Sequence, residues 1–364
     1  MRIKKIFVSY ILLHMYIAHA LVSNVESDTG GLQTTQQDKK NHSPQTKELK
    51  PTHKEVMEQE DSKSEASKQE SALEKRIIKD YARTQIQPFK SDTLDIRSLF
   101  SYFKFYEPWY ILPAYYSFSD MYSPDLMRTE IKAQISFRLE LLNDVVCKFC
   151  AFSFDYMQKI YLQTYNDPQS SPLRDTDLSP GVSFIYKKPI PIANGNGGYF
   201  NWFSIGYNHV SNGERENVNS ADPRQAEWGG NFVRSKALDR VIFETNYRYK
   251  NFNTRIRAWV NISAIAYDGA KTNGDIGKYI GYGDIKFSYT YKNNHFELYL
   301  NNIFNNYFTR DYWNWKGLIE LGYSYGVSKH YAIYAQYLYG HGDSLYEYSL
   351  PVNRIGVGVR LRDF

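Results

Sequence analysis

Hydrophobic and polar residues alternate along most of the chain after about residue 107. In 131–141 every second residue is apolar, and 256–264 repeats the same pattern. Alternation with a period of two predicts β-strands that have one apolar and one polar face. Taking each such run as one strand predicts twelve strands, near residues 109–118, 131–141, 152–164, 181–190, 199–209, 238–249, 254–265, 280–291, 295–302, 315–327, 330–340 and 353–364.

The connections between these predicted strands alternate in length. Long connections such as 165–180, 210–237 and 266–279 are interleaved with short ones such as Asn293-Asn294. An even number of strands of roughly ten residues, with short turns at one rim and long loops at the other, is typical of bacterial outer-membrane barrels. The pattern therefore predicts an all-β fold, a twelve-stranded antiparallel transmembrane β-barrel.

The distribution of aromatic residues supports a membrane location. Of the 60 Tyr, Phe and Trp residues, 57 lie at or after residue 81, and 17–80 contains none. Excess Tyr and Phe is typical of the aromatic girdles of such barrels. A mean hydropathy of −0.56 excludes a protein with several apolar helical spans. A secreted β-sandwich or soluble barrel also alternates, but its apolar face would point inward and would not require so many Tyr.

The chain ends on an aromatic residue, Phe364, as such barrels commonly do. The apolar alternation of the last strand runs through Leu361, however, so Phe364 falls on the opposite parity.

The N-terminal part has a different composition. Residues 1–20 have a basic start, an apolar stretch and the small-x-small sequence Ala18-His19-Ala20, which together predict a secretory signal peptide. Residues 21–95 are rich in Lys, Glu, Gln, Ser and Thr, so we expect a disordered polar extension. The barrel domain is then expected to span 96–364.

Charge and cysteine content exclude some classes of protein. The net charge of +5 is mild and shows no localised basic patch, so we expect no nucleic-acid partner. Two cysteines exclude a disulfide scaffold or a four-thiolate metal site. Cys147 and Cys150 lie in a short connection, where a small disulfide and two inert thiols are the two open readings.

Three polar side chains share a face near the ends of two predicted neighbouring strands. The strand from residue 199 ends in His209 and Ser211, which continue the parity of its apolar face. The strand from residue 238 opens with Asp239, which shares parity with Val241. If these strands form a hairpin, the three side chains converge at one rim, on the lipid-facing outside of the wall.

A hydroxyl, an imidazole and a carboxylate are the groups used in acyl transfer. The imidazole takes the proton of the Ser hydroxyl, and the carboxylate fixes the tautomer and stabilises the resulting cation. A polar set at the edge of a lipid-facing surface indicates a substrate within the lipid. On spacing alone, ordinary solvated loop residues account for the set equally well.

The sequence Tyr207-Asn208-His209-x-Ser211-Asn212-Gly213 closely resembles the catalytic signature of bacterial outer membrane phospholipase A, a twelve-stranded barrel esterase. Residues 170–176 resemble the calcium-loop segment of that family, and 278–282, 340–345 and 354–359 resemble its later strands. The resemblance covers roughly 107–364, and the N-terminal part falls outside it.

This resemblance implies roles for particular residues. Ser211 would be the nucleophile and His209 the general base. Asp239 falls where the enterobacterial pattern has an Asn that orients the His, a task that a carboxylate performs at least as well. The backbone N–H of Gly213 would form the oxyanion hole together with a calcium-bound water.

The resemblance also implies a calcium site. Its ligands would be the backbone carbonyl of Glu214, where the family pattern has Arg, the hydroxyl of Ser235, and Ser170 from a second subunit. No other cofactor is expected. Because the site draws on two subunits, we expect a homodimer.

Together these features predict a calcium-dependent carboxylic ester hydrolase of the outer membrane. It would hydrolyse the acyl ester bonds of phospholipids as a phospholipase A1/A2 and lysophospholipase, with its active site near the outer leaflet. Membrane phospholipids would be its partners. Two alternatives remain open, a porin-like or adhesive barrel without hydrolysis and a lipid A deacylase.

Overall fold

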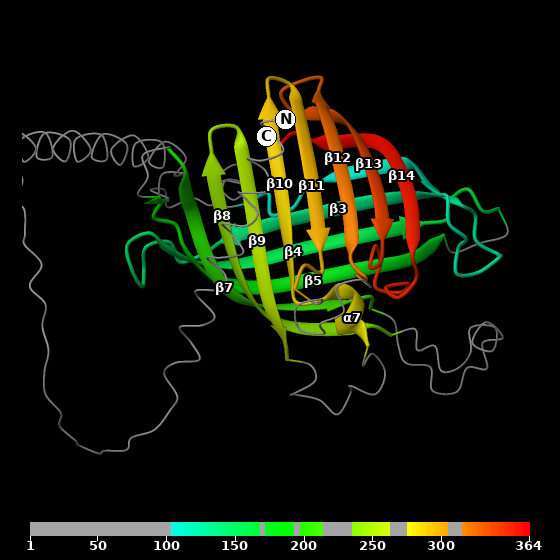
Figure 1. The fold of residues 1–364 in the computed structure, drawn as a ribbon, viewed down its shortest axis with the longest axis horizontal. Helices are drawn as coiled ribbons and strands as arrows, with labels where there is room; N and C mark the ends of the chain where they lie inside the picture. The colour runs from blue at the N-terminus through cyan, green and yellow to red at the C-terminus, as the bar shows by residue number, and fades with distance from the viewer. Residues whose placement is uncertain (1–102, 168–171, 193–196, 214–234, 263–274, 305–314) are drawn as a thin grey trace, which may run out of the picture. The chain divides into compact units, whose positions relative to one another are not determined.

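The computed structural model describes residues 103–167, 172–192, 197–213, 235–262, 275–304 and 315–364. These ranges form antiparallel strands and one short helix, α7 (Ile276–Ile280) (Figure 1). No helix within them is long and apolar enough to cross a membrane. Two strands, β1 (Phe103–Lys104) and β6 (Ile190–Pro191), have two residues each. The long strands are β2 (Tyr110–Ser117), β3 (Thr129–Glu140), β4 (Cys150–Leu162), β5 (Leu173–Tyr186), β7 (Tyr199–Ser211), β8 (Ala237–Tyr249), β9 (Phe252–Asn261), β10 (Gly283–Tyr291), β11 (Asn294–Asn301), β12 (Leu318–Gly326), β13 (Tyr331–Gly340) and β14 (Val352–Leu361).

The twelve long strands close into a ring. Each pairs with an antiparallel neighbour on both sides, and the first strand, β2, pairs with both β3 and the last strand, β14. The pairing of β3 with β4 completes the circle. The twelve-stranded antiparallel barrel predicted from the alternation is therefore confirmed.

Some predicted boundaries were wrong. β5 begins at Leu173, where the alternation placed a loop up to residue 180. The polarity contrast is lost there because a register irregularity buries both Arg174 and Asp175. Helix α7 was not predicted, and β10 begins at Gly283 rather than at 280. The predicted signal peptide (1–20), the polar extension (21–95) and residues 263–265 lie outside the described residues.

The two faces of the wall differ as the alternation predicts. Apolar side chains such as Val182, Ile205 and Val357 are exposed on the outside. Polar side chains such as Lys132 and Gln336 are buried in the lumen. Lipid stabilises the first set, and mutual ion pairs and hydrogen bonds satisfy the second.

The barrel has a turn rim, where the short turns 250–251, 292–293 and 327–330 lie, and a loop rim at the opposite end. At the loop rim, the connection 341–351 folds into the mouth of the barrel. Its Asp343 accepts hydrogen bonds from Lys132 Nζ at 2.8 Å and from Arg354 Nη1 at 2.7 Å. This connection is thereby tied to β3 and β14 from inside.

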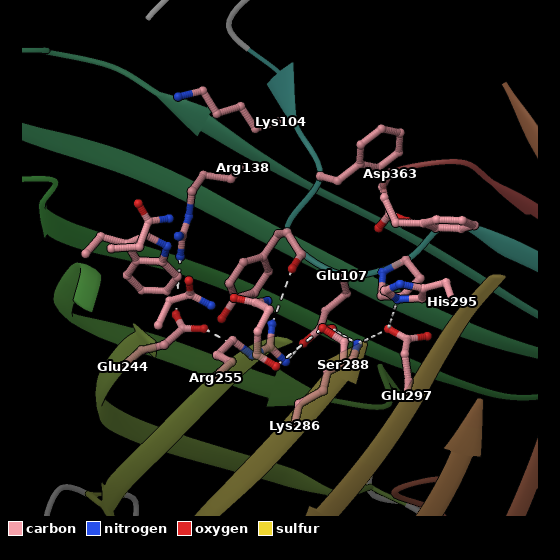
Figure 2. A pocket seen from close by; sticks show the side chains of 18 of the residues that line it. Lys104, Glu107, Arg138, Glu244, Arg255, Lys286, Ser288, His295, Glu297 and Asp363 are labelled. Atoms are coloured by element: carbon pink, nitrogen blue, oxygen red, sulfur yellow. Dashed lines mark hydrogen bonds and ion pairs between the residues drawn. The ribbon is translucent and has the colours of Figure 1, made fainter. Parts of the chain in front are cut away.

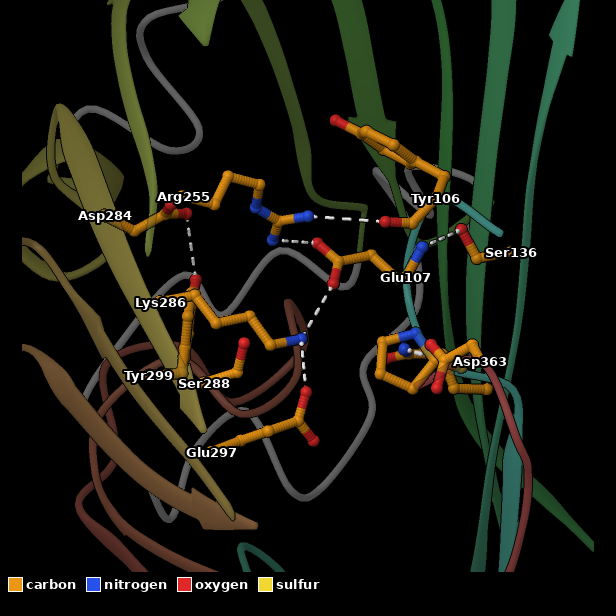
Figure 3. A network of polar contacts seen from close by, with 12 residues as sticks. Tyr106, Glu107, Ser136, Arg255, Asp284, Lys286, Ser288, Glu297, Tyr299 and Asp363 are labelled. Atoms are coloured by element: carbon orange, nitrogen blue, oxygen red, sulfur yellow. Dashed lines mark hydrogen bonds and ion pairs between the residues drawn. The ribbon is translucent and has the colours of Figure 1, made fainter. Parts of the chain in front are cut away.

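At the turn rim, residues 105–108 leave the wall between β1 and β2 and enter the lumen. Glu107 forms ion pairs with Arg255 on β9 and, at 3.2 Å, with Lys286 on β10 (Figure 3). Lys286 Nζ also lies 3.2 Å from Glu297 on β11. Because β2 is six strands away from β9 around the ring, Glu107 links opposite walls of the barrel.

A cavity of about 460 Å³ lies beside this link, and Figure 2 shows that charged side chains line it. Among them, Arg138 pairs with Asp155 at 2.6 Å and lies 3.4 Å from Glu244. Phe364 also lines the cavity, where it stacks on His295 with 4.4 Å between ring centroids. The last aromatic residue thus faces the lumen, which is consistent with its parity.

Cys147 lies in the turn between β3 and β4, and Cys150 is the first residue of β4. A disulfide joins Cys147 to Cys150, with 5.3 Å between their Cα atoms. Of the two interpretations that the sequence left open, the structure has the small disulfide.

Candidate active site

The predicted catalytic residues lie at the loop rim, on the hairpin formed by β7 and β8. These strands pair in a register that puts His209 opposite Asp239 and Ser211 opposite Ala237. His209 and Ser211 project outward with Tyr207, since residues 208 and 210 are buried on the inner side. In the structure the three side chains lie on the same outer face of the wall, as expected from parity.

His209 and Asp239 are in direct contact. Nδ1 of His209 lies 2.8 Å from Oδ1 of Asp239, and the two side chains are 35% and 16% exposed. When Nδ1 carries its proton it donates to the carboxylate, and Nε2 is then the free proton acceptor. This is the tautomer that a general base requires.

Ser211 lies next to His209 on the same face of β7. No hydrogen bond joins their side chains in the described part of the chain. Residues two apart on a strand are separated by about 6.6 Å along its axis, a gap that rotation of the two side chains bridges. Catalytic hydrogen bonds in substrate-free sites are often long and tighten only when substrate binds.

The alternate residues of the same segment hold it from the lumen side. Asn208 Nδ2 donates to Ser179 Oγ on β5 at 3.0 Å, and Arg240 Nη2 donates to Asn208 Oδ1 at 2.6 Å. Asn212 Oδ1 accepts a hydrogen bond from the backbone N–H of Lys236 at 3.0 Å. These polar contacts fix the catalytic strand to both of its neighbours.

An apolar cluster supports the hairpin from behind. Val210 and Leu238, the inward neighbours of the candidate catalytic residues, pack against Ile276 of α7 and against Leu345 and Tyr348 of the loop 341–351. The hydroxyl of Tyr348 donates in turn to the side chain of Asp275, at the start of α7. The catalytic hairpin therefore rests on two loop-rim elements that are distant in sequence.

Gly213, the expected oxyanion-hole residue, follows the end of β7. Its φ is +69°, a left-handed conformation that L side chains rarely adopt, and a Cβ there would approach the side chain of Leu178 at 3.4 Å. The conformation explains why this position carries Gly and turns the chain away from the strand.

The predicted calcium ligands are only partly within the described residues. Ser170 and Glu214 lie outside them. Ser235 is described and immediately precedes Lys236, whose backbone pairs with Asn212, so it lies across the hairpin end from Gly213. Within the described ranges, no three His, Cys, Asp or Glu residues group in a way that holds a metal.

Sequence reasoning missed one participant, Tyr207. Its hydroxyl donates to Oδ1 of Asp239 at 2.6 Å. Part of the signal was available, because Tyr207 shares the outward parity of His209. Its diagonal position relative to Asp239 follows only from the register of β7 and β8. Diagonal neighbours of this kind are within reach of aromatic side chains.

The fold and the site together define a transmembrane β-barrel with a Ser, a His and a carboxylate on its outer wall. A family model described as Phospholipase A1 matches residues 89–361, three quarters of the sequence. The chain therefore belongs to the Phospholipase A1 family, and it is a bacterial outer-membrane β-barrel protein.

Individual relatives support this family assignment. The chain is 28% identical to Phospholipase A1 of Salmonella typhimurium over 245 residues, 66% of this chain and 73% of the relative. It is 27% identical to a putative phospholipase A1 of Neisseria meningitidis over 291 residues, 75% of this chain and 68% of the relative.

Solved structures agree on the fold. Outer membrane phospholipase A from Escherichia coli superposes with a TM-score of 0.59 at 24% identity, covering 72% of this chain and 99% of the other. The Salmonella typhi outer membrane phospholipase, described as a dimer with bound calcium, superposes with a TM-score of 0.59 at 25% identity, covering 77% and 95%.

Proposed function

We propose that this protein hydrolyses the acyl ester bonds of phospholipids in the outer membrane in a calcium-dependent reaction, as a phospholipase A. The observation that carries the proposal is the contact of 2.8 Å between His209 Nδ1 and Asp239 Oδ1, beside Ser211 on the outer wall. Membership of the Phospholipase A1 family supports the same activity.

In the first half-reaction, Ser211 Oγ attacks the carbonyl carbon of the ester while His209 Nε2 takes the hydroxyl proton. The tetrahedral intermediate collapses, the C–O bond to the glycerol oxygen breaks, and His209 returns the proton to that oxygen. A lysophospholipid leaves and the acyl group stays on Ser211. Water then attacks the acyl-enzyme in the same way, with His209 as base, and releases the fatty acid.

Asp239 has an orienting role in this scheme. Its carboxylate holds the Nδ1 proton of His209, so that Nε2 faces Ser211. It also stabilises the imidazolium that forms when the Ser proton is taken.

The carbonyl oxygen of the substrate becomes negatively charged in the tetrahedral intermediate. The backbone N–H of Gly213 follows directly on the strand that carries Ser211 and His209, and it is the donor assigned to this charge. Donors aimed at a developing oxyanion typically contribute about 10²–10³-fold in rate.

Calcium fits the donor set proposed for it. The hydroxyl of Ser235, the backbone carbonyl of Glu214 and Ser170 of a second subunit offer oxygen atoms alone, the ligands that Ca²⁺ prefers. Three protein oxygens leave room for water within the six to eight ligands usual for this ion. When bound, calcium supplies positive charge near the developing oxyanion. The shared ligand set implies a homodimer, and the Salmonella typhi relative is itself described as a dimer with bound calcium.

The test is fatty-acid release from mixed micelles of phosphatidylcholine and detergent, with calcium or with excess chelator. We expect Ser211→Ala to fold and insert normally but to lose at least about 10³-fold in kcat, because the nucleophile is gone. Chelation is expected to abolish turnover of the unaltered protein.

Ser204→Ala is the matched control, since Ser204 lies on the same strand but is buried on the inner side. This variant should keep its activity. Hydrolysis that is unchanged in Ser211→Ala would refute the proposed nucleophile, and turnover that survives chelation would refute the role of calcium.

A further inference from the structure

The carboxylate of Asp239 receives two contacts on the same oxygen atom. Oδ1 lies 2.8 Å from His209 Nδ1 and accepts the hydroxyl of Tyr207 at 2.6 Å. We propose that Tyr207 is a positioning residue that acts on His209 through Asp239. This inference rests on the proposed function, because it concerns the efficiency of His209 as the base for Ser211.

A carboxylate on an apolar outer wall needs hydrogen-bond donors. Asp239 is only 16% exposed at its side chain and shares its face with the apolar Val241. An ionised carboxylate in an apolar environment is costly unless it is hydrogen-bonded. The phenol is a neutral donor, so it stabilises the anion without pairing it with a positive charge.

The geometry also explains why the donor is at residue 207. His209 lies directly opposite Asp239 in the register, and Tyr207 lies diagonally, two residues further from the loop rim. The imidazole and the phenol therefore approach Oδ1 from two positions along β7. Without the phenol, the carboxylate loses one of its contacts, and the orientation of the imidazole is then less well fixed.

Few other groups compete with this arrangement. Among the described residues, the outward positions nearest to His209 carry no ionisable side chain apart from Tyr207 and Asp239. They are Leu178, Pro180 and Val182 on β5, Ala237 and Val241 on β8, and Val260 and Ile262 at the end of β9.

The test is Tyr207→Phe, assayed on mixed micelles of phosphatidylcholine with calcium present. We expect kcat to fall by about tenfold, the effect of losing one hydrogen bond to a charged group, with KM within about twofold of the unaltered value. The acid limb of the kcat/KM profile should move to higher pH. Asp239 then presents more of its negative charge to the imidazole, which favours imidazolium, and only the neutral imidazole acts as base.

A second set of variants, built on Asp239→Ala, tests whether Tyr207 acts through Asp239. Asp239→Ala removes the acceptor of both contacts. If the phenol acts only through that carboxylate, adding Tyr207→Phe to Asp239→Ala should change the residual kcat by less than about twofold. Tyr323→Phe is the control, because Tyr323 is an outward tyrosine on β12 whose hydroxyl donates to Asn294 at 2.8 Å, at the turn rim. It should leave both kcat and the pH profile unchanged.

Three results would overturn the inference. One is Tyr207→Phe with unaltered kcat and pH profile, and another is the same fold loss with and without Asp239. The third is a change confined to KM, which would make Tyr207 a lipid contact. Any of these, with Ser211→Ala inactive, leaves the proposed function standing. Full activity of Ser211→Ala instead removes the proposed function itself.

Discussion

Two aspartates at the loop rim show how differently the two faces of the wall use a carboxylate. Asp343, inside the barrel, is fully buried, and its oxygens accept from Lys132 at 2.8 Å, Arg354 at 2.7 Å and the hydroxyl of Tyr115 at 2.7 Å. Asp239, on the outside, contacts His209 and the phenol of Tyr207. The inner carboxylate is held by the fixed positive charges of a Lys and an Arg, whereas the outer one contacts an imidazole and a phenol.

The two carboxylates therefore differ in what they can do: one stabilises the fold, and the other can assist the proposed reaction. A group clamped between a Lys and an Arg stays ionised and stationary, and it joins distant parts of the chain. A carboxylate facing an imidazole gains most when that imidazole becomes charged, which is the moment at which a general base needs help. Under the proposed function, the lumenal carboxylate thus stabilises the fold, and the outer carboxylate assists proton transfer.

The largest test of this comparison makes the same substitution on both faces. Asp343→Asn leaves Lys132 and Arg354 without their anion, so we expect it to lower the free energy of unfolding by about 3–5 kcal/mol. Asp239→Asn should change that free energy by less than about 1 kcal/mol and lower kcat by roughly tenfold. Urea unfolding in detergent micelles, followed by Trp fluorescence, and fatty-acid release measure the two effects.

The comparison fails if the two variants behave alike. A stability loss in Asp239→Asn equal to that of Asp343→Asn would mean that the outer site also holds the barrel together. Arg354→Lys is a useful companion, because it keeps a charge beside Asp343 and should lose less stability than Asp343→Asn.

Lowering the pH is expected to have a smaller effect on the stability of the fold. Burial alone would raise the pKa of Asp343, but Lys132 and Arg354 hold it well below its usual range. A carboxyl group with a lowered folded-state pKa stabilises the fold above its unfolded pKa of about 3.9, and the contribution is lost as the pH falls toward the folded value. The difference in urea midpoint between the unaltered protein and Asp343→Asn should therefore narrow below about pH 4. A difference that stays constant from pH 7 to pH 3 would contradict this assignment.

The smallest effect is expected for an ion pair in water. Arg128 and Asp120 pair at the loop rim between β2 and β3, but their side chains are 47% and 91% exposed. Exposed pairs contribute about 0–1 kcal/mol, so Arg128→Gln should shift the free energy of unfolding by less than about 1 kcal/mol. A loss comparable to that of Asp343→Asn would show that burial is not what distinguishes the lumenal pairs.

Much of the fold was predictable because alternation encodes which face each residue occupies. The prediction from alternation failed at the start of β5, because Arg174 and Asp175 are both buried and the period of two is broken there. It also gave no sign of Glu107, whose partners Arg255 and Lys286 are almost 150 and 180 residues away. Contacts across a lumen depend on closure of the ring, which local patterns do not contain.

The residues of the candidate site also differ in how far the sequence alone could predict their positions. The outward positions of His209 and Ser211 followed from parity on a single strand, and their proposed roles came from the family resemblance. Asp239 required the register between two strands joined by a long connection, and the structure supplies it as a direct pairing with His209. Tyr207 was missed because its role depends on a diagonal contact, which becomes visible only once that register is known.

The outward orientation of Ser211 has a kinetic consequence. A substrate for this serine arrives by diffusing within the leaflet, so the quantity that governs turnover is a surface density of lipid and not a concentration in water. Diluting phosphatidylcholine in the plane with a non-hydrolysable lipid should then slow the enzyme at constant bulk lipid. Because both products are amphiphiles, they remain in the same plane and alter the packing of the membrane that holds the enzyme.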